Sequence, residues 1–270
     1  MIMNNSCCDI CNEKNFSNII KVQSINYVSC DNCSVVRQYP YPSDLEINNF
    51  YNNYKTYKST NSNYLAENST SLFIADKELT FRDLQINKDF FVGKKLLDVG
   101  CATGNFINMM ANYNLTYLKG IDVSQECIQI ARSKNLNCVK NNFLDEKEKY
   151  DIISLWHVIE HIRKPLEYLD HAFNLLNENG ILLLETPVIG KVSNAFGSNW
   201  RYFMPVEHIN LFSFSSLINL SLNCGFKLKS FTRFGSGNDG DKISEPNKKS
   251  MDRIAKEMGW GDTLAICLIK

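Results

Sequence analysis

The stretch "LLDVGCATGNF", Leu96–Phe106, decides the fold. Its first residues are apolar and end at Gly100, which is typical of a buried strand that stops at a turn. Gly104 closes the turn, and a helical pattern begins after it. In open parallel sheets ligands bind where a strand ends and the next helix begins. The stretch therefore predicts a strand, a cofactor-binding turn and a helix.

The spacing of the turn narrows the choice of cofactor. A dinucleotide-binding turn reads G-x-G-x-x-G, and here Ala102 stands where its middle glycine would be. That glycine lets the backbone approach a pyrophosphate, so its absence counts against NAD or FAD. The stretch also lacks the G-x-x-x-x-G-K-[ST] pattern of a P-loop. What remains is D-x-G-x-x-x-G, with Asp98 two residues before the first glycine.

Strands and helices alternate after this turn, which predicts an α/β fold with a parallel sheet covered on both faces. The expected strands are 94–100, 117–123, 150–156 and 181–187, followed by two late strands at 227–234 and 262–269. The expected helices are 103–113, 124–134, 164–176 and 214–226.

Five segments in order resemble the motifs of class I S-adenosylmethionine (SAM) methyltransferases. They are "LLDVGCATGNF", "GIDVSQE", "VKNNFLD", "YDIISLWHVIEHIRKPLEYL" and "GILLLETP". The resemblance covers residues 94–234 and implies a Rossmann-like, seven-stranded methyltransferase sheet with SAM as the cofactor.

The resemblance also implies roles for individual residues. Asp98 would orient the ammonium end of SAM, Gly100 and Gly104 would admit its chain, and Asp122 would accept hydrogen bonds from the ribose hydroxyls. The two aspartates also fit a plain capping role, and Phe143 also fits the core. The remaining expected cofactor contacts are Cys101, Val123, Asn142, Phe143, Leu155 and Trp156.

Three ionisable residues crowd the segment "WHVIEH". Methyl transfer from a sulfonium is an in-line displacement that depends chiefly on alignment, and a base helps only when the acceptor carries a proton of high pKa. We expect His157 to be that base or to contact the substrate, and Glu160 to contact the substrate. Each also fits a structural role, and His157, Glu160 and His161 together also fit a metal triad, as in an acidic version of this cluster in ubiquinone-type O-methyltransferases.

An insertion at about 188–212 resembles the one that roofs the pocket of many bacterial small-molecule methyltransferases. It carries Trp200, Arg201 and His208. Trp200 is expected to contact the substrate, Arg201 to pair with a phosphate or carboxylate, and His208 to serve as an alternative base. Simple packing or a solvated surface position is the other interpretation of each.

Four of the ten cysteines have the spacing of a zinc site. Cys8, Cys11, Cys30 and Cys33 form two C-x2-C pairs, which predicts a structural zinc ribbon. Cys7 would replace Cys8 if the first pair were C-x3-C. A ribbon followed by a SAM domain resembles sugar C-methyltransferases and related enzymes of cell-surface polysaccharide pathways, although the large C-terminal domain of the former has no counterpart here.

The predicted organisation has three parts: a ribbon at 1–40, a helical and Asn-rich linker and lid at 41–93, and the SAM-binding domain at 94–270. Formal net charge is zero, so nucleic acid is not expected as the main substrate. No apolar run is long enough to span a membrane, and no secretory signal is evident, so the cytoplasm is the expected location. Nothing in the sequence predicts the oligomeric state or the role of residues 235–261.

The sequence therefore predicts a SAM-dependent methyltransferase that acts on a small polar acceptor. A nucleotide-linked or phosphorylated sugar or a polysaccharide precursor is the expected class, with O-methylation favoured. Two other functions stay open: a protein or RNA methyltransferase that docks through the ribbon, and a non-catalytic SAM-binding scaffold.

Overall fold

A computed structural model describes residues 7–52, 67–237 and 244–270. Its strands form one eleven-stranded sheet, of which seven make the central part. In spatial order these are β6 (Cys138–Lys140), β5 (Tyr117–Asp122), β4 (Lys95–Val99), β7 (Tyr150–Trp156), β8 (Leu176–Ile189), β11 (Thr263–Ile269) and β10 (Lys227–Phe234). The first five run parallel, and β11 runs antiparallel to both of its neighbours. The predicted α/β, Rossmann-like fold is confirmed.

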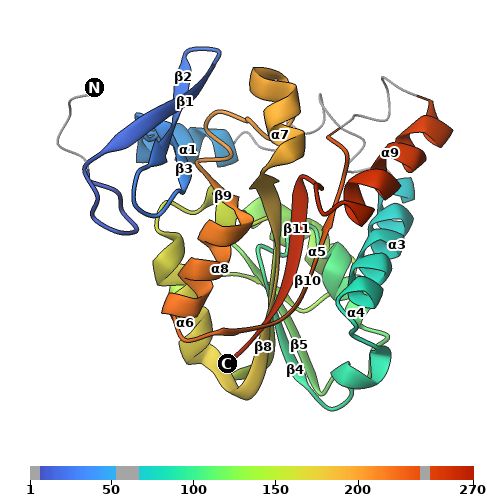
Figure 1. Cartoon of the computed structure of the whole chain (residues 1–270). Coiled ribbons are helices and arrows are strands. Elements are labelled where there is room, and N and C mark those ends of the chain that lie inside the picture. Colours follow the sequence, from blue (N-terminus) through green and yellow to red (C-terminus); the bar gives the residue numbers. More distant parts are fainter. Residues whose placement is uncertain (1–6, 53–66, 238–243) are drawn as a thin grey trace.

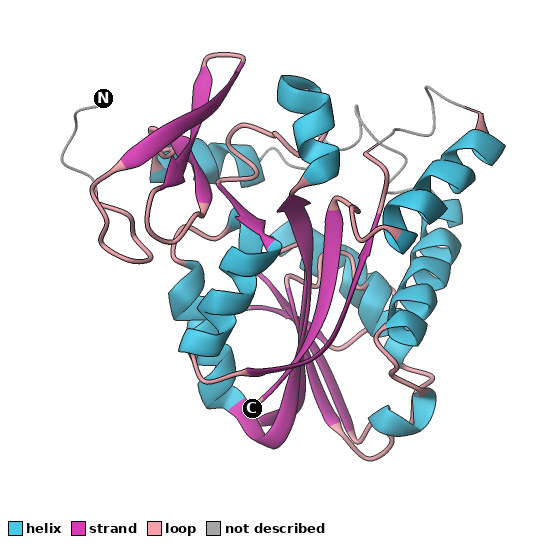
Figure 2. Cartoon of the chain, viewed as in Figure 1, coloured by secondary structure: helices cyan, strands magenta, loops and turns pink. Residues whose placement is uncertain are grey.

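Helices cover both faces of this sheet (Figures 1 and 2). On one face lie α6 (Pro165–Leu175) and α8 (Phe214–Asn223). On the other lie α3 (Glu67–Asp83) and α4 (Asn105–Met110), while α5 (Gln125–Ser133) packs beside β5 and β6. The helix α9 (Glu245–Glu257) packs against β10 and occupies much of the segment whose role the sequence left open.

The run of apolar residues in β8 follows from this two-sided cover. Leu182 and Leu184 pack into the core under α6 and α8, whereas Ile181 and Leu183 pack into the core under α3 and α4. Successive side chains of a strand point to opposite faces, so a strand covered on both sides must be apolar throughout.

The N-terminal segment extends the sheet. β1 (Phe16–Val22), β2 (Ile25–Cys30) and β3 (Val36–Tyr39) form an antiparallel unit, followed by α1 (Asp44–Asn52). β3 pairs with β9 (Asn210–Ser213), and β9 pairs in parallel with the end of β8. The sequence did not predict β9, because four residues inside an insertion give almost no periodicity and the partner strand is far away in the chain.

Short elements complete the fold: η2 (Lys88–Phe91), η3 (Phe143–Asp145), η4 (Ile159–His161), α7 (Lys191–Phe196) and η5 (Gly197–Asn199). The segment "VIEH" forms only the single turn η4, not a longer helix. Part of the predicted lid, residues 53–66, lies outside the described residues, and the predicted domain boundaries stay predictions. No helix within the described ranges is long and apolar enough to cross a membrane.

Candidate functional site

A pocket of about 430 Å³ opens at the carboxyl ends of β4, β5 and β7. One end is walled by the glycine turn and the residues after β5, and the other by η4 and the insertion between β8 and β9. Gly100 and Asp122 belong to the first end, and His161 and His208 to the second. We call the first the cofactor end and the second the acceptor corner. A crevice at the carboxyl ends of parallel strands is where this type of sheet binds ligands.

The glycine turn is held by backbone bonds and by close packing. Gly100 N and Cys101 N both donate to Ile121 O, at 2.8 and 3.0 Å. Gly100 has a φ of 70°, and a side chain there would come within 2.5 Å of Val158. Gly104, with a φ of 82°, lies off the pocket wall, and a Cβ there would come within 2.5 Å of Leu136. Both glycines are therefore required by the fold of the turn, since other residues rarely adopt these φ values.

Asp122 lies at the end of β5 and lines the pocket. Its Oδ2 accepts a hydrogen bond from Ala102 N at 2.9 Å, and its Oδ1 accepts one from Ser124 N at 2.8 Å. Burial raises the pKa of the carboxyl, which these backbone bonds partly offset. The side chain thus ties the glycine turn to the start of α5, and a carboxylate has further lone pairs for a ligand in the pocket.

Asp98 is buried below the turn and does not line the pocket. Its Oδ1 accepts a hydrogen bond from Ser154 Oγ at 2.7 Å. Burial raises the pKa of Asp98 to about 8, although the bond from Ser154 acts in the opposite direction. An added positive charge nearby would favour its ionised form.

Of the six other predicted cofactor residues, three line the pocket and three do not. Val123, Phe143 and Trp156 line the pocket. Cys101 packs with Cys138 in a small buried cluster.

The side chains of two more lie away from the pocket. Leu155 points into the core under α6 and α8. Asn142 caps η3, with its Oδ1 accepting from Leu144 N, and its neighbour Asn141 lines the pocket instead. A motif match alone did not decide which of these two neighbouring asparagines faces the pocket.

His157 lines the pocket, but both of its ring nitrogens face carboxylates. Nδ1 lies 3.1 Å from Glu160 Oε1, and Nε2 lies 3.1 Å from Glu185 Oε1. Burial acts to lower the pKa of His157, but the two carboxylates outweigh it and raise the pKa to about 9. The ring is therefore an imidazolium at neutral pH, with both N–H groups donated.

Glu185 and its partner Lys77 were not found from the sequence. Lys77 lies on α3, its side chain is only 3% exposed, and its ammonium pairs with Glu185 Oε1 and lies 4.6 Å from the Trp156 ring centroid. The one signal for Glu185 was an acidic residue at the end of the apolar run "ILLLETP". Lys77, Glu185, His157 and Glu160 form a continuous chain of charges from α3 to η4.

Glu160 is fully buried at the end of this chain and does not line the pocket. Its Oε2 accepts a hydrogen bond from Thr186 Oγ1 at 2.9 Å. Burial acts to raise its pKa, but the bond from His157 and the nearby histidines hold the pKa of Glu160 at about 2.

His161 and His208 meet at the acceptor corner, with ring centroids 4.9 Å apart. His161 Nδ1 lies 2.8 Å from Glu207 O, and His208 Nδ1 lies 2.9 Å from Tyr202 O. Because a carbonyl oxygen only accepts, each Nδ1 carries the proton. Burial lowers the pKa of His208 to about 3, so this ring is neutral.

The structure does not bring Trp200 or Arg201 to the pocket. Trp200 is 1% exposed and packs in the core between the N-terminal strands and the insertion, with its Nε1 donating to Asp262 Oδ2 at 3.0 Å. Arg201 pairs with Asp262 Oδ1 at 3.3 Å. The carboxylate is that of buried Asp262, directly before β11, and its two oxygens hold both side chains away from the pocket. Tyr202, which follows them, lines the pocket.

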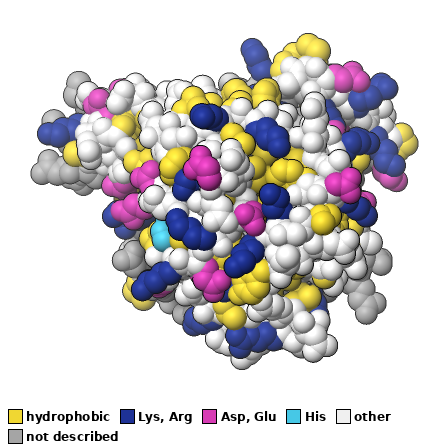
Figure 3. Space-filling model, turned by 90° about the horizontal axis from the view of Figure 1, so that it is seen from below, with side chains coloured by type: hydrophobic (Ala, Val, Ile, Leu, Met, Phe, Trp, Pro, Cys, Tyr) yellow, Lys and Arg dark blue, Asp and Glu magenta, His cyan; other side chains and the backbone are white. Residues whose placement is uncertain are grey.

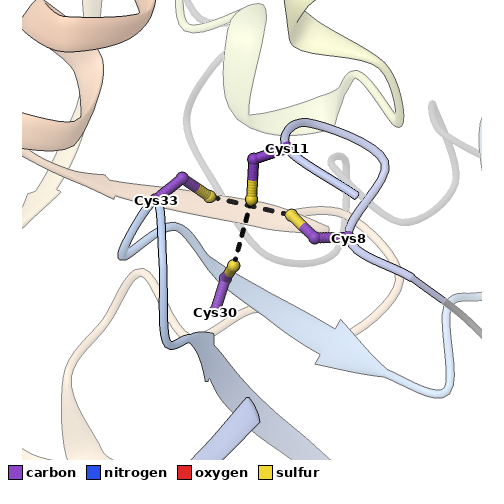
Figure 4. Close-up of side chains that lie close together, drawn as sticks. All are labelled: Cys8, Cys11, Cys30 and Cys33. Atoms are coloured by element: carbon purple, nitrogen blue, oxygen red, sulfur yellow. Dashed lines mark hydrogen bonds between the residues drawn. The ribbon is translucent and has the colours of Figure 1, made fainter. Parts of the chain in front are cut away.

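The four cysteines of the predicted ribbon converge on one point (Figure 4). Cys8 Sγ lies 3.7 Å from Cys33 Sγ, and Cys11 Sγ lies 3.4 Å from Cys30 Sγ. A tetrahedral zinc with Zn–S bonds of about 2.3 Å places its sulfur ligands about 3.8 Å apart. The donor set and the spacing therefore fit zinc, and Cys7 is not part of the group.

Charges on the surface are mixed. Figure 3 shows Lys and Arg scattered among Asp, Glu and apolar side chains over the face that it displays. That face has no continuous basic stripe of the kind that follows a nucleic-acid backbone.

Comparison with known proteins identifies the family. A family model described as "Methyltransferase domain" matches residues 75–230, which is more than half of the chain. The chain is 31% identical over 118 residues to the ubiquinone biosynthesis O-methyltransferase of Glaesserella parasuis, covering 38% of this chain and 49% of that protein. It is 30% identical over 114 residues to the mitochondrial enzyme of that name from Saccharomyces cerevisiae, covering 38% and 36%. The chain thus spans about half or less of the length of these curated relatives.

Solved structures agree on the fold. A SAM-dependent methyltransferase from Archaeoglobus fulgidus superposes with a TM-score of 0.55 at 17% identity, covering 77% of this chain and 97% of that one. A possible histamine N-methyltransferase from Thermotoga maritima gives 0.53 at 18%, covering 84% and 99%. The chain belongs to this methyltransferase family and carries a class I SAM-dependent methyltransferase domain.

Proposed function

We propose that this methyltransferase transfers the methyl group of SAM to an oxygen of a small polar molecule in the cytoplasm. The observation that carries the proposal is a single pocket that joins the glycine turn and Asp122 to the histidines of the acceptor corner. The curated relatives named O-methyltransferases support oxygen as the acceptor atom.

SAM would lie along the cofactor end of the pocket. Asp122 would accept hydrogen bonds from the ribose hydroxyls, Phe143 would flank the adenine, and Asp98 would balance the ammonium group from below the turn. This arrangement would direct the methyl group toward Trp156 and the acceptor corner. Four other predicted cofactor residues do not line the pocket and would shape the site only through packing or backbone: Cys101, Gly104, Asn142 and Leu155.

The chemistry needs alignment more than acid–base help. The acceptor oxygen attacks the methyl carbon, the carbon–sulfur bond breaks, and its electron pair stays on sulfur as a neutral thioether. A hydroxyl acceptor must also lose its proton. His208 is the better of the two predicted bases, because both nitrogens of His157 are already bonded to carboxylates. His157 would instead fix the wall of the pocket.

We propose that the cysteine cluster holds a structural zinc ion. The metal would join the segment at Cys8 and Cys11 to the segment at Cys30 and Cys33, and would stabilise a unit of three short strands whose core is shared with the insertion. The ion would have no catalytic role, because none of its four ligands lines the pocket.

The acceptor class is the least determined part of the proposal. A phosphorylated or nucleotide-linked sugar was expected partly because of Arg201, which is engaged with Asp262 outside the pocket. Around the acceptor corner, the rings of Tyr168, Tyr202 and Trp156 lie beside the polar side chains of His157 and Glu207, a lining that accommodates a sugar or a phenol ring. Both classes therefore belong in the test.

The test is methyl transfer from labelled SAM to a panel of nucleotide-linked sugars, phosphorylated sugars and phenols, with a protein extract and total RNA as competing acceptors. We expect turnover with at least one small molecule, and a loss of about 10²-fold or more in kcat for His208→Gln. The exposed variant Lys95→Gln is the matched control and should retain full activity. Labelling of protein or RNA alone would contradict the proposal, and full turnover by His208→Gln would remove its role as base.

A further inference from the structure

We propose that Gln38, a residue of the N-terminal strands, is a positioning residue that holds His208 in place at the acceptor corner. Gln38 lies on β3, is 1% exposed and is separated from His208 by 170 residues of chain. It does not line the pocket itself. The inference deepens the proposed function, on which it rests for the role of His208 as base.

The residues before His208 form a tight turn. His208 N donates to Met204 O at 2.9 Å, which closes a turn over residues 204–208. Glu207 and His208 stand at the end of this turn, and both line the pocket. The backbone of the turn therefore sets where these two side chains lie.

The amide of Gln38 joins several backbone groups of this turn. Its Nε2 donates to His208 O at 2.8 Å and to Met204 O at 3.5 Å, and its Oε1 accepts from Val206 N at 3.1 Å. Because a backbone N–H only donates and a carbonyl only accepts, a single orientation of the amide satisfies these contacts. An apolar side chain offers none of these bonds, and a carboxylate offers only the acceptor.

Val206 shows that the turn needs support from outside. Its φ is 73°, a left-handed conformation that β-branched residues rarely adopt. Strained conformations of this kind cost about 1–3 kcal/mol and persist only where surrounding contacts fix them. The bond from Val206 N to Gln38 is a contact that fixes this one. Without it the turn would relax and carry His208 with it.

The N-terminal strands are thereby part of the acceptor corner. Gln38 N donates to Ile209 O at 3.0 Å, and Tyr27 OH donates to His208 O at 3.4 Å. β3 also pairs with β9, which begins at Asn210 directly after these residues (Figure 1). The unit that carries the cysteine cluster therefore supports the wall from which His208 reaches the pocket.

A fixed position for His208 matters for methyl transfer. Its ring donates from Nδ1 to Tyr202 O at 2.9 Å, which leaves the lone pair of Nε2 to accept the proton of the acceptor hydroxyl. A displacement of about 1 Å near the reacting atoms can lower a rate by about 10²-fold. Since Gln38 acts only through His208, its loss should lower kcat and leave cofactor binding unchanged.

The experiment compares the wild type with Gln38→Met, which keeps the length of the side chain and loses its hydrogen bonds. With an acceptor from the panel above, kcat should fall by about 10-fold or more, while the KM for SAM and the affinity for S-adenosylhomocysteine change by less than about twofold. In spectra of protein labelled with ¹⁵N-histidine, the His208 ring should show only the Nδ1–H tautomer in the wild type and a mixture of tautomers in the variant. A purely structural role would lower stability against urea without changing kcat or the tautomer.

Tyr41→Phe is the matched control. Tyr41 OH donates to Asn210 Oδ1 at 3.1 Å across the same boundary and, within the described residues, forms no hydrogen bond with the turn. This variant should keep the kcat and the His208 tautomer of the wild type. Gln38→Asn keeps the amide on a chain one methylene shorter, which cannot reach both sides of the turn, and it takes the place of Gln38→Met if that variant does not fold.

The two measurements separate this inference from the proposed function. The tautomer is recorded without any acceptor, so it tests the position of the His208 ring even if methyl transfer to oxygen fails. A single Nδ1–H tautomer in the folded Gln38 variant, or an equal change in Tyr41→Phe, would overturn the inference. An unchanged kcat in Gln38→Met would do the same where His208→Gln is inactive. Full turnover by His208→Gln would remove only the role of base, and a mixed tautomer would still show that Gln38 positions the ring.

Discussion

The cysteine cluster and the acceptor corner are both groups of ionisable side chains, but they are built in different ways. The cysteine cluster comes from two C-x2-C pairs joined by one hairpin, so its spacing is visible in the sequence. The acceptor corner joins η4 to a distant insertion, and its carboxylate, Glu160, is held by His157 and Thr186. A local cluster can be recognised from spacing, whereas an assembled cluster depends on the fold that brings its members together.

Removal of one cysteine ligand should have the largest effect. Cys30→Ser leaves a tetrahedral site with three thiolates, and binding of structural zinc in small domains contributes roughly 10–16 kcal/mol. We expect loss of bound zinc and of hydrogen-exchange protection in β1–β3, while β4–β8 stay protected. Cys7→Ser is the matched control and should keep both. Retention of zinc by Cys30→Ser, or its loss from Cys7→Ser, would show that the ligand set is different.

Lys77→Met tests the chain of charges that lies behind the acceptor corner. It leaves Glu185 buried beside His157 without its lysine, and removal of one partner of a buried ion pair costs about 3–5 kcal/mol. Urea unfolding should report this loss. The double variant Lys77→Met/Glu185→Gln removes both charges and should recover part of it. If the single variant is as stable as the wild type, the chain of charges does not hold the acceptor corner.

The glycine turn, like the cysteine cluster, is recognisable from residues that are close together in the sequence. Gly104→Ala combines an unfavourable φ with a clash against Leu136, which together should cost about 2–4 kcal/mol in unfolding free energy. Gly93→Ala is the control, because its φ is 73° but no atom lies within 4 Å of the added methyl. Equal costs for the two variants would mean that backbone strain, and not the close packing against Leu136, explains the glycine.

The last prediction concerns the pH dependence of Asp98. Its pKa of about 8 in the folded protein lies above the ordinary value, so between about pH 4 and 8 the folded state holds a proton that the unfolded chain has lost. The contribution of Asp98 to stability therefore falls as the pH rises through this window.

Binding of the ligand ammonium should release the proton from Asp98. The affinity for S-adenosylhomocysteine should rise between pH 6 and 8 by at most about tenfold per unit. Calorimetry in buffers of different ionisation enthalpy measures the proton directly. Asp98→Asn should abolish the release, and an unchanged release would assign the proton to another group.

The same contrast explains what the sequence could predict. Strand β10 was expected at 227–234 and is found there, because its boundaries depend on local pattern. The turn around Gly100 and the acid at Asp122 were likewise local. Lys77 and Glu185 were missed because each is an ordinary surface type of residue until the fold buries it, and the meeting of His161 with His208 depends on the course of the insertion. The inward turn of Arg201 toward Asp262 has the same cause.

The central claim is that the cofactor end binds SAM, and one titration tests it most directly. Zinc-loaded protein is titrated by calorimetry with S-adenosylhomocysteine and, separately, with NAD, alongside the Asp122→Asn variant. We predict one site with micromolar affinity for S-adenosylhomocysteine, no binding of NAD, and an affinity about 10-fold to 100-fold weaker in the variant, since it loses charge-assisted hydrogen bonds to the ribose. Absence of binding by the wild type, or equal affinity for NAD, would contradict the claim.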